Sequence, residues 1–218
     1  MHNPDSSNSP LIEIKNINIR FNQKTITQNF NLEINKQDKV IITGESGLGK
    51  SSLLKVLMGF IIPSSGEIYY NGVTITNTNI WKFRQKIAYV SQDMDIGVGS
   101  VLSLIETIFT YKSNKNLGLD IQEAKQLLAQ FSLPVDVLST DYEKLSGGEK
   151  QRVQIVIAIL LKRDIFFLDE ATSALDRHMK QVVKDYFTNS NHTVIAVAHD
   201  DIWFESKNVR KVILKEEK

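Results

Sequence analysis

Residues 44–51 read Gly-Glu-Ser-Gly-Leu-Gly-Lys-Ser, and this stretch decides how the chain folds. A continuous apolar run, 40–43, comes directly before it, and the apolar residues after it recur at helical spacing, so a strand, a loop and a helix are predicted in that order. Such a loop turns its backbone N–H groups toward phosphate oxygens, and the helix N-terminus adds partial positive charge. A phosphate-binding loop is therefore predicted, with Lys50 near the β- and γ-phosphates and the Ser51 hydroxyl available to Mg²⁺. The carboxylate of Glu45 would repel phosphate and is expected to point away from it.

The segments on either side of this loop predict an α/β fold. Near the N-terminus apolar and polar residues alternate, as in half-buried antiparallel strands, whereas later apolar runs are continuous, as in strands covered on both faces. Helical patterns separate the later runs, which is typical of a parallel α/β core. The alternating runs are 11–14, 17–21 and 30–34, and the continuous runs are 40–43, 86–91, 165–168 and 193–198.

Between residues 92 and 160 the pattern is helical instead, and we interpret this region as an inserted α-helical subdomain. Its apolar residues include a stripe at Ala124, Leu127, Leu128 and Phe131 and the nearly continuous run 153–161. The expected fold is a P-loop NTPase α/β core with a mixed, mainly parallel sheet and an N-terminal antiparallel layer, plus the helical insertion. After a disordered tail, 1–10, one domain is expected over 11–218, with a RecA-like core at 11–91 and 161–218 and the helical subdomain at 92–160.

The composition excludes several other classes of protein. With 42% hydrophobic residues in 218, the chain can bury a substantial core. Its 26 lysines and arginines nearly balance 25 aspartates and glutamates, so no overall field attracts it to nucleic acid or to an anionic membrane. It has no cysteine, and its longest apolar run, 155–161, is far shorter than the ~20 residues of a membrane-spanning helix. The N-terminus is polar and carries no secretory signal. From the charge, the missing cysteines, the short apolar runs and this N-terminus together, we expect a cytoplasmic protein with no nucleic-acid partner and no direct membrane insertion.

A second part of the phosphate site is predicted where the run 165–168 leads into Asp169 and Glu170. Ligands collect at the carboxyl ends of the strands in sheets of this kind. Adjacent side chains point in different directions, so Asp169 can hold Mg²⁺ through its water shell while Glu170 polarises an attacking water. Taken alone, the two residues could also be a solvated acid pair at the end of a strand.

The family is indicated by Leu145-Ser146-Gly147-Gly148-Glu149, continued by Lys150-Gln151-Arg152. Ser146 and Glu149 are spaced as a capping box, yet two glycines weaken a first helical turn and suit a close approach of phosphate to the backbone, and both readings can hold together. With this motif the chain resembles the ATP-binding cassette (ABC) family from about residue 11 to 213. Residues 131–134, ahead of the signature, are similar to small bacterial ATPase subunits associated with metal or iron export.

The resemblance implies further site residues. Phe21 stands where the family stacks an aromatic ring on adenine, although the strand pattern alone allows it to face the core. Gln92 resembles the Q-loop glutamine, which senses Mg²⁺ and the attacking water, and His199 matches the switch histidine at the γ-phosphate. Asp176, in the stretch 173–176, resembles the D-loop aspartate at the opposite subunit, or caps a helix. The residues expected to contact ATP within one chain are Phe21, Gly44, Ser46, Gly47, Leu48, Gly49, Lys50, Ser51 and Ser52.

The resemblance also implies a dimer, expected to be a homodimer, in which the phosphate loop of one subunit and the signature of the other close on each ATP. The residues expected to contact ATP in trans are Ser146, Gly147, Gly148 and Glu149. The residues assigned to catalysis are Glu170, His199, Lys50 and Gln92, and those assigned to Mg²⁺ are Ser51, Gln92 and Asp169. Separate transmembrane permease subunits would dock near 92–104, on the inner face of the cell membrane.

Two other functions stay open on the sequence alone. One is a soluble ATPase of the same superfamily that acts on nucleic acid, ribosomes or an envelope complex, and the other is a degenerate cassette that serves as a scaffold. Intact Lys50, Glu170 and His199 argue against the scaffold.

The chain departs from the family pattern at a few positions. They are Asp38-Lys39, Ser52 and Asp164, together with the wholly apolar stretch 155–159, in a helix where the family commonly carries an arginine. The sequence leaves open how that helix is anchored electrostatically.

Overall fold

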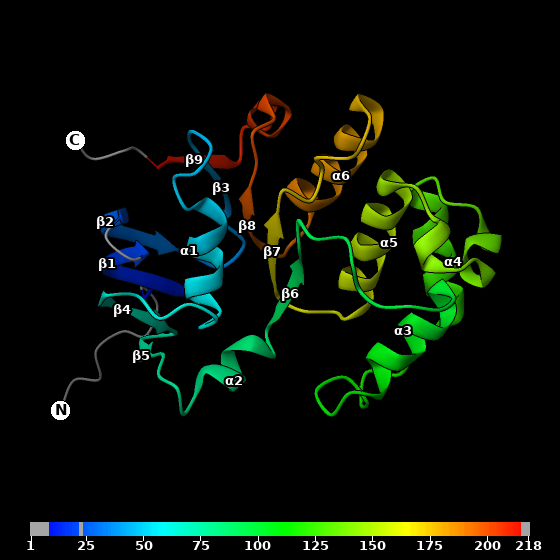
Figure 1. The fold of residues 1–218 in the computed structure, drawn as a ribbon, viewed down its shortest axis with the longest axis horizontal. Coiled ribbons are helices and arrows are strands. Elements are labelled where there is room, and N and C mark those ends of the chain that lie inside the picture. The colour runs from blue at the N-terminus through cyan, green and yellow to red at the C-terminus, as the bar shows by residue number, and fades with distance from the viewer. Residues whose placement is uncertain (1–8, 22–23, 215–218) are drawn as a thin grey trace.

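A five-stranded parallel sheet in the order β6-β7-β8-β3-β9 lies at the centre of the chain (Figure 1). The computed structural model describes residues 9–21 and 24–214, and most of the tail predicted at 1–10 lies outside them. Strands β7, β8 and β3 are the predicted continuous apolar runs, and they are buried because other elements cover both faces of the sheet. The strands are β3 (Lys39–Thr43), β6 (Ile87–Val90), β7 (Ile165–Asp169), β8 (Thr193–Val197) and β9 (Val209–Ile213).

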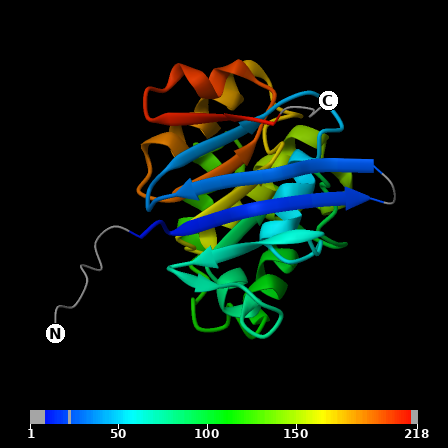
Figure 2. The same ribbon diagram turned by 90° about the vertical axis from the view of Figure 1, so that its left-hand side faces the viewer.

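A second sheet is antiparallel, as the N-terminal alternation predicts, and has the order β2-β1-β4-β5 (Figure 2). The prediction of two separate strands at 11–14 and 17–21 is wrong, because both runs belong to β1. The register of β1 against β2 shifts between Ile14 and Ile17. Strands β4 and β5 were not predicted. Strand β4 begins with the polar, glycine-containing stretch 65–67, and β5 is very short. The strands are β1 (Ile12–Phe21), β2 (Lys24–Ile34), β4 (Ser65–Tyr70) and β5 (Val73–Thr74).

The helices cover the two faces of the parallel sheet with separate cores. Helix α1 (Lys50–Leu57) follows the glycine-rich loop as predicted, ends just before Gly59 and lies between the two sheets (Figure 1). The opposite face packs against α5 (Gly147–Leu160), which is apolar nearly all round and largely buried. The other helices are α2 (Ile80–Arg84), α3 (Val101–Thr110), α4 (Ile121–Gln130) and α6 (Arg177–Asn189), with 3-10 turns η1 (Val135–Ser139), η2 (Tyr142–Lys144) and η3 (Asp201–Glu205).

The anchoring of α5, which the sequence left open, comes from its first turns. Arg152 donates hydrogen bonds to the carbonyls of Phe131 at 3.1 Å and Ser132 at 2.8 Å, at the C-terminal end of α4. A cation at a helix C-terminus is favourable because the carbonyl ends carry partial negative charge. Within the described ranges, no helix combines the length and the apolarity needed to cross a bilayer.

We expect Phe166→Ala to lower the free energy of unfolding by about 3–5 kcal/mol, because removing a buried aromatic ring leaves a cavity in a well-packed core. Phe166 is fully buried in β7, and its ring lies against Phe187 and His192. Urea unfolding checks the value. Val73→Ala, at an exposed position, is the control and should stay within about 0.5 kcal/mol of the unmodified chain. A similar loss in both variants would contradict the assignment of the core.

Candidate functional site

The glycine-rich loop wraps around the ammonium group of Lys50. Its Nζ donates to the carbonyl oxygens of Gly44 at 3.0 Å and Glu45 at 2.8 Å, while the Glu45 side chain is exposed. Burial lowers the pKa of Lys50, and the charges of Glu170 and Asp169 oppose that shift. At Gly49, φ is 81° and a Cβ atom would meet a methyl carbon of Ile26 at 2.0 Å, so only glycine fits there. The loop therefore holds a cation at the N-terminus of α1, as phosphate binding requires.

Ser51 and Asp169 meet across 118 positions of sequence. The Ser51 hydroxyl donates to Oδ1 of Asp169 at 2.6 Å, because α1 begins beside the carboxyl end of β7. Tyr89, on the neighbouring strand β6, donates its hydroxyl to Oδ2 of Asp169 at 3.1 Å. Burial and the charge of Asp169 raise the pKa of Tyr89 to about 12, which keeps the hydroxyl protonated as a donor. The structure thus brings together two residues that the sequence assigned to Mg²⁺. It adds Tyr89, to which the sequence assigned no role.

The carboxylate of Glu170 lies between Gln92 and His199. Nε2 of Gln92 donates to Oε2 of Glu170 at 3.0 Å, and Nε2 of His199 lies 3.4 Å from Oε1. Glu170 has a φ of 50°, a left-handed conformation that non-glycine residues rarely adopt. Its N–H donates to the carbonyl of Val197, and its carbonyl accepts from Nε2 of Gln151. The sequence assigned Glu170, Gln92 and His199 to one site, and they do lie together.

Gln151 was missed in the sequence. The only signal was an amide side chain next to the signature in a helix that soon becomes apolar. Its side chain is fully buried and bonds to the segment 170–174.

The signature forms the N-terminus of α5 as a capping box. Oε2 of Glu149 accepts from both N and Oγ of Ser146, at 2.9 and 2.7 Å, and these hydrogen bonds lower the pKa of Glu149. Gly147 and Gly148 form the first turn, and a Cβ at Gly148 would meet the carbonyl oxygen of Ala174 at 3.1 Å. The structural reading of this motif is therefore correct, and the glycines permit a close approach of two backbone segments.

Asp176 caps α6 by accepting a hydrogen bond from the N–H of Met179 at 2.8 Å, so its structural reading is also correct. Phe21 is the last residue of β1, and its side chain lies outside the described part of the chain, so stacking on adenine stays a prediction.

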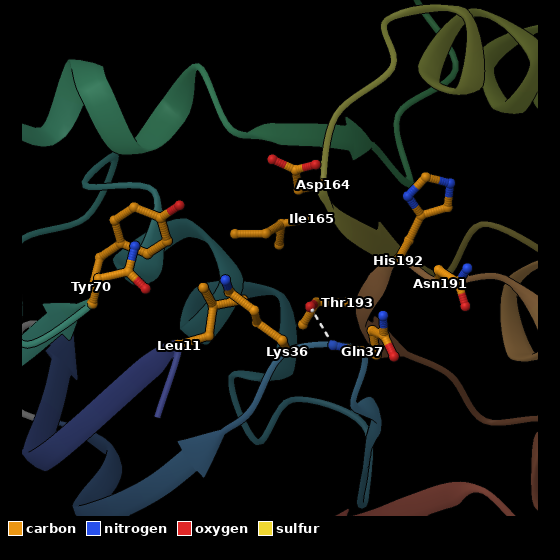
Figure 3. Close-up of a pocket in the computed structure, with 10 residues that line it drawn as sticks. Leu11, Lys36, Gln37, Tyr70, Asp164, Ile165, Asn191, His192 and Thr193 are labelled. Carbon is orange, nitrogen blue, oxygen red and sulfur yellow. Dashed lines mark hydrogen bonds between the residues drawn. The ribbon is translucent and has the colours of Figure 1, made fainter. Parts of the chain in front are cut away.

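A cavity of about 320 Å³ lies at the other edge of the parallel sheet, before the amino ends of β7 and β8 (Figure 3). Its lining includes Asp164 and His192, and the N–H of Gln37 donates to Oγ1 of Thr193 at 2.9 Å. Burial lowers the pKa of His192. Ligands of such sheets bind at the carboxyl ends of the strands, so this cavity is separate from the phosphate site.

The fold and the site define a P-loop ATPase. The sequence profile of the ABC transporter family matches residues 27–173. The chain belongs to the ABC transporter family, and it is an ATP-binding subunit that hydrolyses ATP to drive transport.

Relatives named as ATP-binding proteins of transporters support this assignment over the soluble ATPase and the scaffold. The ergothioneine transport ATP-binding protein EgtV of Helicobacter pylori is 32% identical over 200 residues, covering 88% of this chain and 91% of the relative. The probable iron export ATP-binding protein FetA of Escherichia coli is 32% identical over 197 residues, covering 88% and 86%. The zinc import ATP-binding protein ZnuC of Haemophilus influenzae is 35% identical over 200 residues, covering 90% and 68%.

Solved structures confirm the predicted fold class. The dimeric ATP-binding cassette MJ0796, in a post-hydrolysis state with ADP and Pi, superposes with a TM-score of 0.77 at 26% identity over 94% of each chain. A bacterial Atm1-family ABC exporter with ATP bound gives a TM-score of 0.81 at 25% identity, covering 96% of this chain and 39% of the exporter chain.

Proposed function

We propose that two copies of the chain close on two ATP molecules and that Glu170 activates the water that attacks each γ-phosphate. The observation that carries this proposal is the position of the Glu170 carboxylate, between Gln92 and His199 at the carboxyl edge of the sheet. Two groups fix the carboxylate, so it can orient a water and accept its proton in line with the phosphate. His199, which is about half exposed, is free to contact the γ-phosphate on its open side.

Mg²⁺ fits the residues beside this carboxylate. Ser51 and Asp169 offer a hydroxyl and a carboxylate 2.6 Å apart, and hard oxygen ligands next to bound phosphates suit this ion. When bound, Mg²⁺ would neutralise charge that develops on the phosphate oxygens. We assign Ser51 and Gln92 to direct contact with the ion and Asp169 to its water shell, with Tyr89 orienting Asp169.

The nucleotide would replace the carbonyl groups that now hold Lys50. Its ammonium bonds to the carbonyls of Gly44 and Glu45, and a β- or γ-phosphate oxygen is a stronger acceptor than either because it is charged. The residues proposed to contact ATP in the same chain are Phe21, Ser46, Gly47, Leu48, Gly49 and Ser52, in addition to Gly44, Lys50 and Ser51.

The second subunit is needed because α1 and α5 pack into the separate cores on opposite faces of the parallel sheet (Figure 1). The phosphate loop and the signature begin these two helices, so we propose that the signature serves the ATP of the other copy. Ser146 and the backbone N–H groups of Gly147 and Gly148 would bind its γ-phosphate, since a helix N-terminus attracts anions, and Glu149 would support Ser146. The D-loop residue Asp176 would lie at the dimer interface.

The transport partner is proposed to be a separate permease in the cell membrane, with this single-domain cassette on its cytoplasmic face. Relatives that carry ergothioneine, iron or zinc differ in cargo, and two of them differ in direction, one importing and one exporting. A cassette with a shared site and variable cargo suits a permease that selects the substrate.

A groove between β6 and α5 is the proposed docking surface for this permease. Its volume is about 320 Å³, and Ile96, Ile108 and Ile157 give it apolar walls. Asp93 and Asp95 stand exposed at its rim, and Oε1 of the buried Gln154 has no hydrogen-bond partner among the described residues. A buried acceptor without a partner is costly, so a donor entering the groove would be favoured. The groove therefore suits an apolar cytoplasmic helix of the permease with a lysine or arginine.

Glu170→Gln tests the proposed reaction. We expect this variant to bind ATP normally, to hydrolyse it at least about 100-fold more slowly because the general base is gone, and to accumulate as a dimer in MgATP. Phosphate release and light scattering measure the two effects. Glu45→Gln, at an exposed position of the loop, is the control and should keep normal turnover. If Glu170→Gln stays monomeric at saturating MgATP, the closing dimer is wrong.

Ser146→Asp separates the capping role of the signature from phosphate binding. Aspartate and asparagine cap helices about as well as serine, but an aspartate carboxylate here would lie against Oε2 of Glu149, which Oγ of Ser146 contacts at 2.7 Å. Ser146→Asn should unfold within about 1 kcal/mol of the unmodified chain. Ser146→Asp is therefore combined with Glu149→Gln, which removes the repulsion, and compared with Ser146→Asn in the same Glu149→Gln chain. Only aspartate places a negative charge against the γ-phosphate of the other subunit. In the Glu170→Gln background, the aspartate variant should lose the ATP dimer, while asparagine retains more of it. Equal dimerisation of the two variants would show that Ser146 only caps the helix.

Val98→Asp tests the docking surface. Val98 is 73% exposed in the loop beside the groove, whereas Val135, 47% exposed in η1, offers the same side chain elsewhere. We expect Val98→Asp to keep normal ATPase activity in the isolated chain but to lose the integral membrane protein that co-purifies from native membranes. Val135→Asp should keep both. Retention of that partner by Val98→Asp, or its loss in both variants, would contradict the proposed surface.

A further inference from the structure

Gln151 joins the signature helix to the catalytic glutamate within one chain. Its amide is fully buried five residues after Ser146, and every polar contact of the side chain goes to the segment 170–174. Nε2 donates to the carbonyl of Glu170 at 3.0 Å and to Oγ of Ser173 at 3.3 Å, while Oε1 accepts from the N–H of Ala174 at 3.0 Å. The two donors and the acceptor of the amide are thus all used, so its position is well determined.

The bond to Glu170 acts at a constrained point of the backbone. Glu170 has a φ of 50°, and its N–H is held by the carbonyl of Val197 at 3.0 Å. Gln151 holds the carbonyl on the other side of the same residue. Because an unfavourable φ persists only where the surroundings fix it, Gln151 helps to set the direction of the Glu170 carboxylate toward Gln92 and His199.

The first turn of α5 also touches this segment directly. At Gly148 a Cβ atom would come within 3.1 Å of the Ala174 carbonyl oxygen, and at Gly147 within 3.8 Å of the Ala174 side chain. A displacement of the signature therefore presses on Ala174 through the backbone and pulls on Glu170 through Gln151. No other buried side chain of α5 hydrogen-bonds to 170–174 among the described residues.

We propose that Gln151 is a positioning residue that couples the two ATP sites: contact of the signature with the ATP of the partner aligns Glu170 of the same chain for its own ATP. The inference rests on the proposed function, which places the signature at the γ-phosphate of the other subunit. It adds a direction of coupling. The ATP bound by the partner determines the alignment of Glu170 at the hydrolytic site of this chain. Closure of the dimer precedes this alignment and does not need Gln151.

The test is Gln151→Ala in the full chain, because it removes all three hydrogen bonds. We expect kcat for ATP hydrolysis to fall about tenfold or more, as a small displacement of a catalytic group costs that much, while KM for ATP stays within about twofold because the phosphate loop is untouched. In the Glu170→Gln background, Gln151→Ala should still form the ATP dimer. A general loss of structure would impair dimerisation as well. A lower kcat together with normal dimerisation is therefore specific to a positioning role.

Asn114→Ala is the matched control, since Asn114 is also a buried amide that donates to a backbone carbonyl, that of Ile108 at 2.8 Å, outside the nucleotide site. It should lower the thermal midpoint as much as Gln151→Ala and leave kcat unchanged. The inference is overturned if Gln151→Ala keeps normal kcat, if Asn114→Ala loses as much kcat, or if Gln151→Ala prevents the ATP dimer of Glu170→Gln. Failure of Glu170→Gln alone to dimerise would instead refute the proposed function.

Discussion

The hydrogen bond between Ser51 and Asp169 joins the two halves of the candidate nucleotide site, and it constrains the order of the strands that carry them. Ser51 is in the first turn of α1, and Asp169 ends β7, so the bond requires β3, the strand before the loop, to lie near β7 in one parallel sheet. Strand β8 lies between them, and it leads to His199 on the same edge. A parallel order of β7, β8 and β3 therefore delivers the acids, the histidine and the phosphate loop to one place.

Burial of this sheet on both faces is the physical reason for the proposed sharing of each ATP between two chains. Neighbouring residues of β7 point to opposite sides, so Phe166 joins the core under α5 while Phe167 joins the core under α1. The helix that begins with the phosphate loop and the helix that begins with the signature are thus separated by the thickness of the sheet. In the proposed dimer, the N-termini of α1 and α5 would serve one nucleotide because a second subunit supplies one of them.

Much of this arrangement could be predicted because it depends on local patterns. The run 40–43, the glycines after it and the apolar spacing after Lys50 specify a strand, loop and helix without reference to distant residues. The candidate site residues were predicted through motifs, whose positions in the sequence are fixed even though their contacts in space are not. Strands β4 and β5 depend instead on pairing with β1, which supplies order that their own polar sequence does not specify. Tyr89 and Gln151 were missed for the same reason, since their importance lies in partners 80 and 19 to 23 positions away.

In α5 the apolar residues pack in the core, whereas the polar side chains near the signature contact neighbouring segments. Residues 155–159 are apolar and buried, and Ile157 also lines the groove beside β6, so the polar contacts of this helix are concentrated in residues 147–154. There Arg152 binds the C-terminal carbonyls of α4, Gln151 binds the segment after β7, and Gln154 donates to the carbonyl of Asp93 at 3.1 Å. These three side chains connect one helix end to the end of α4, to the segment 170–174 and to the segment after Gln92. Directional hydrogen bonds therefore fix the signature end of the helix, while its apolar end makes non-directional contacts. Under the proposed coupling, a displacement of the signature would reach all three neighbours together.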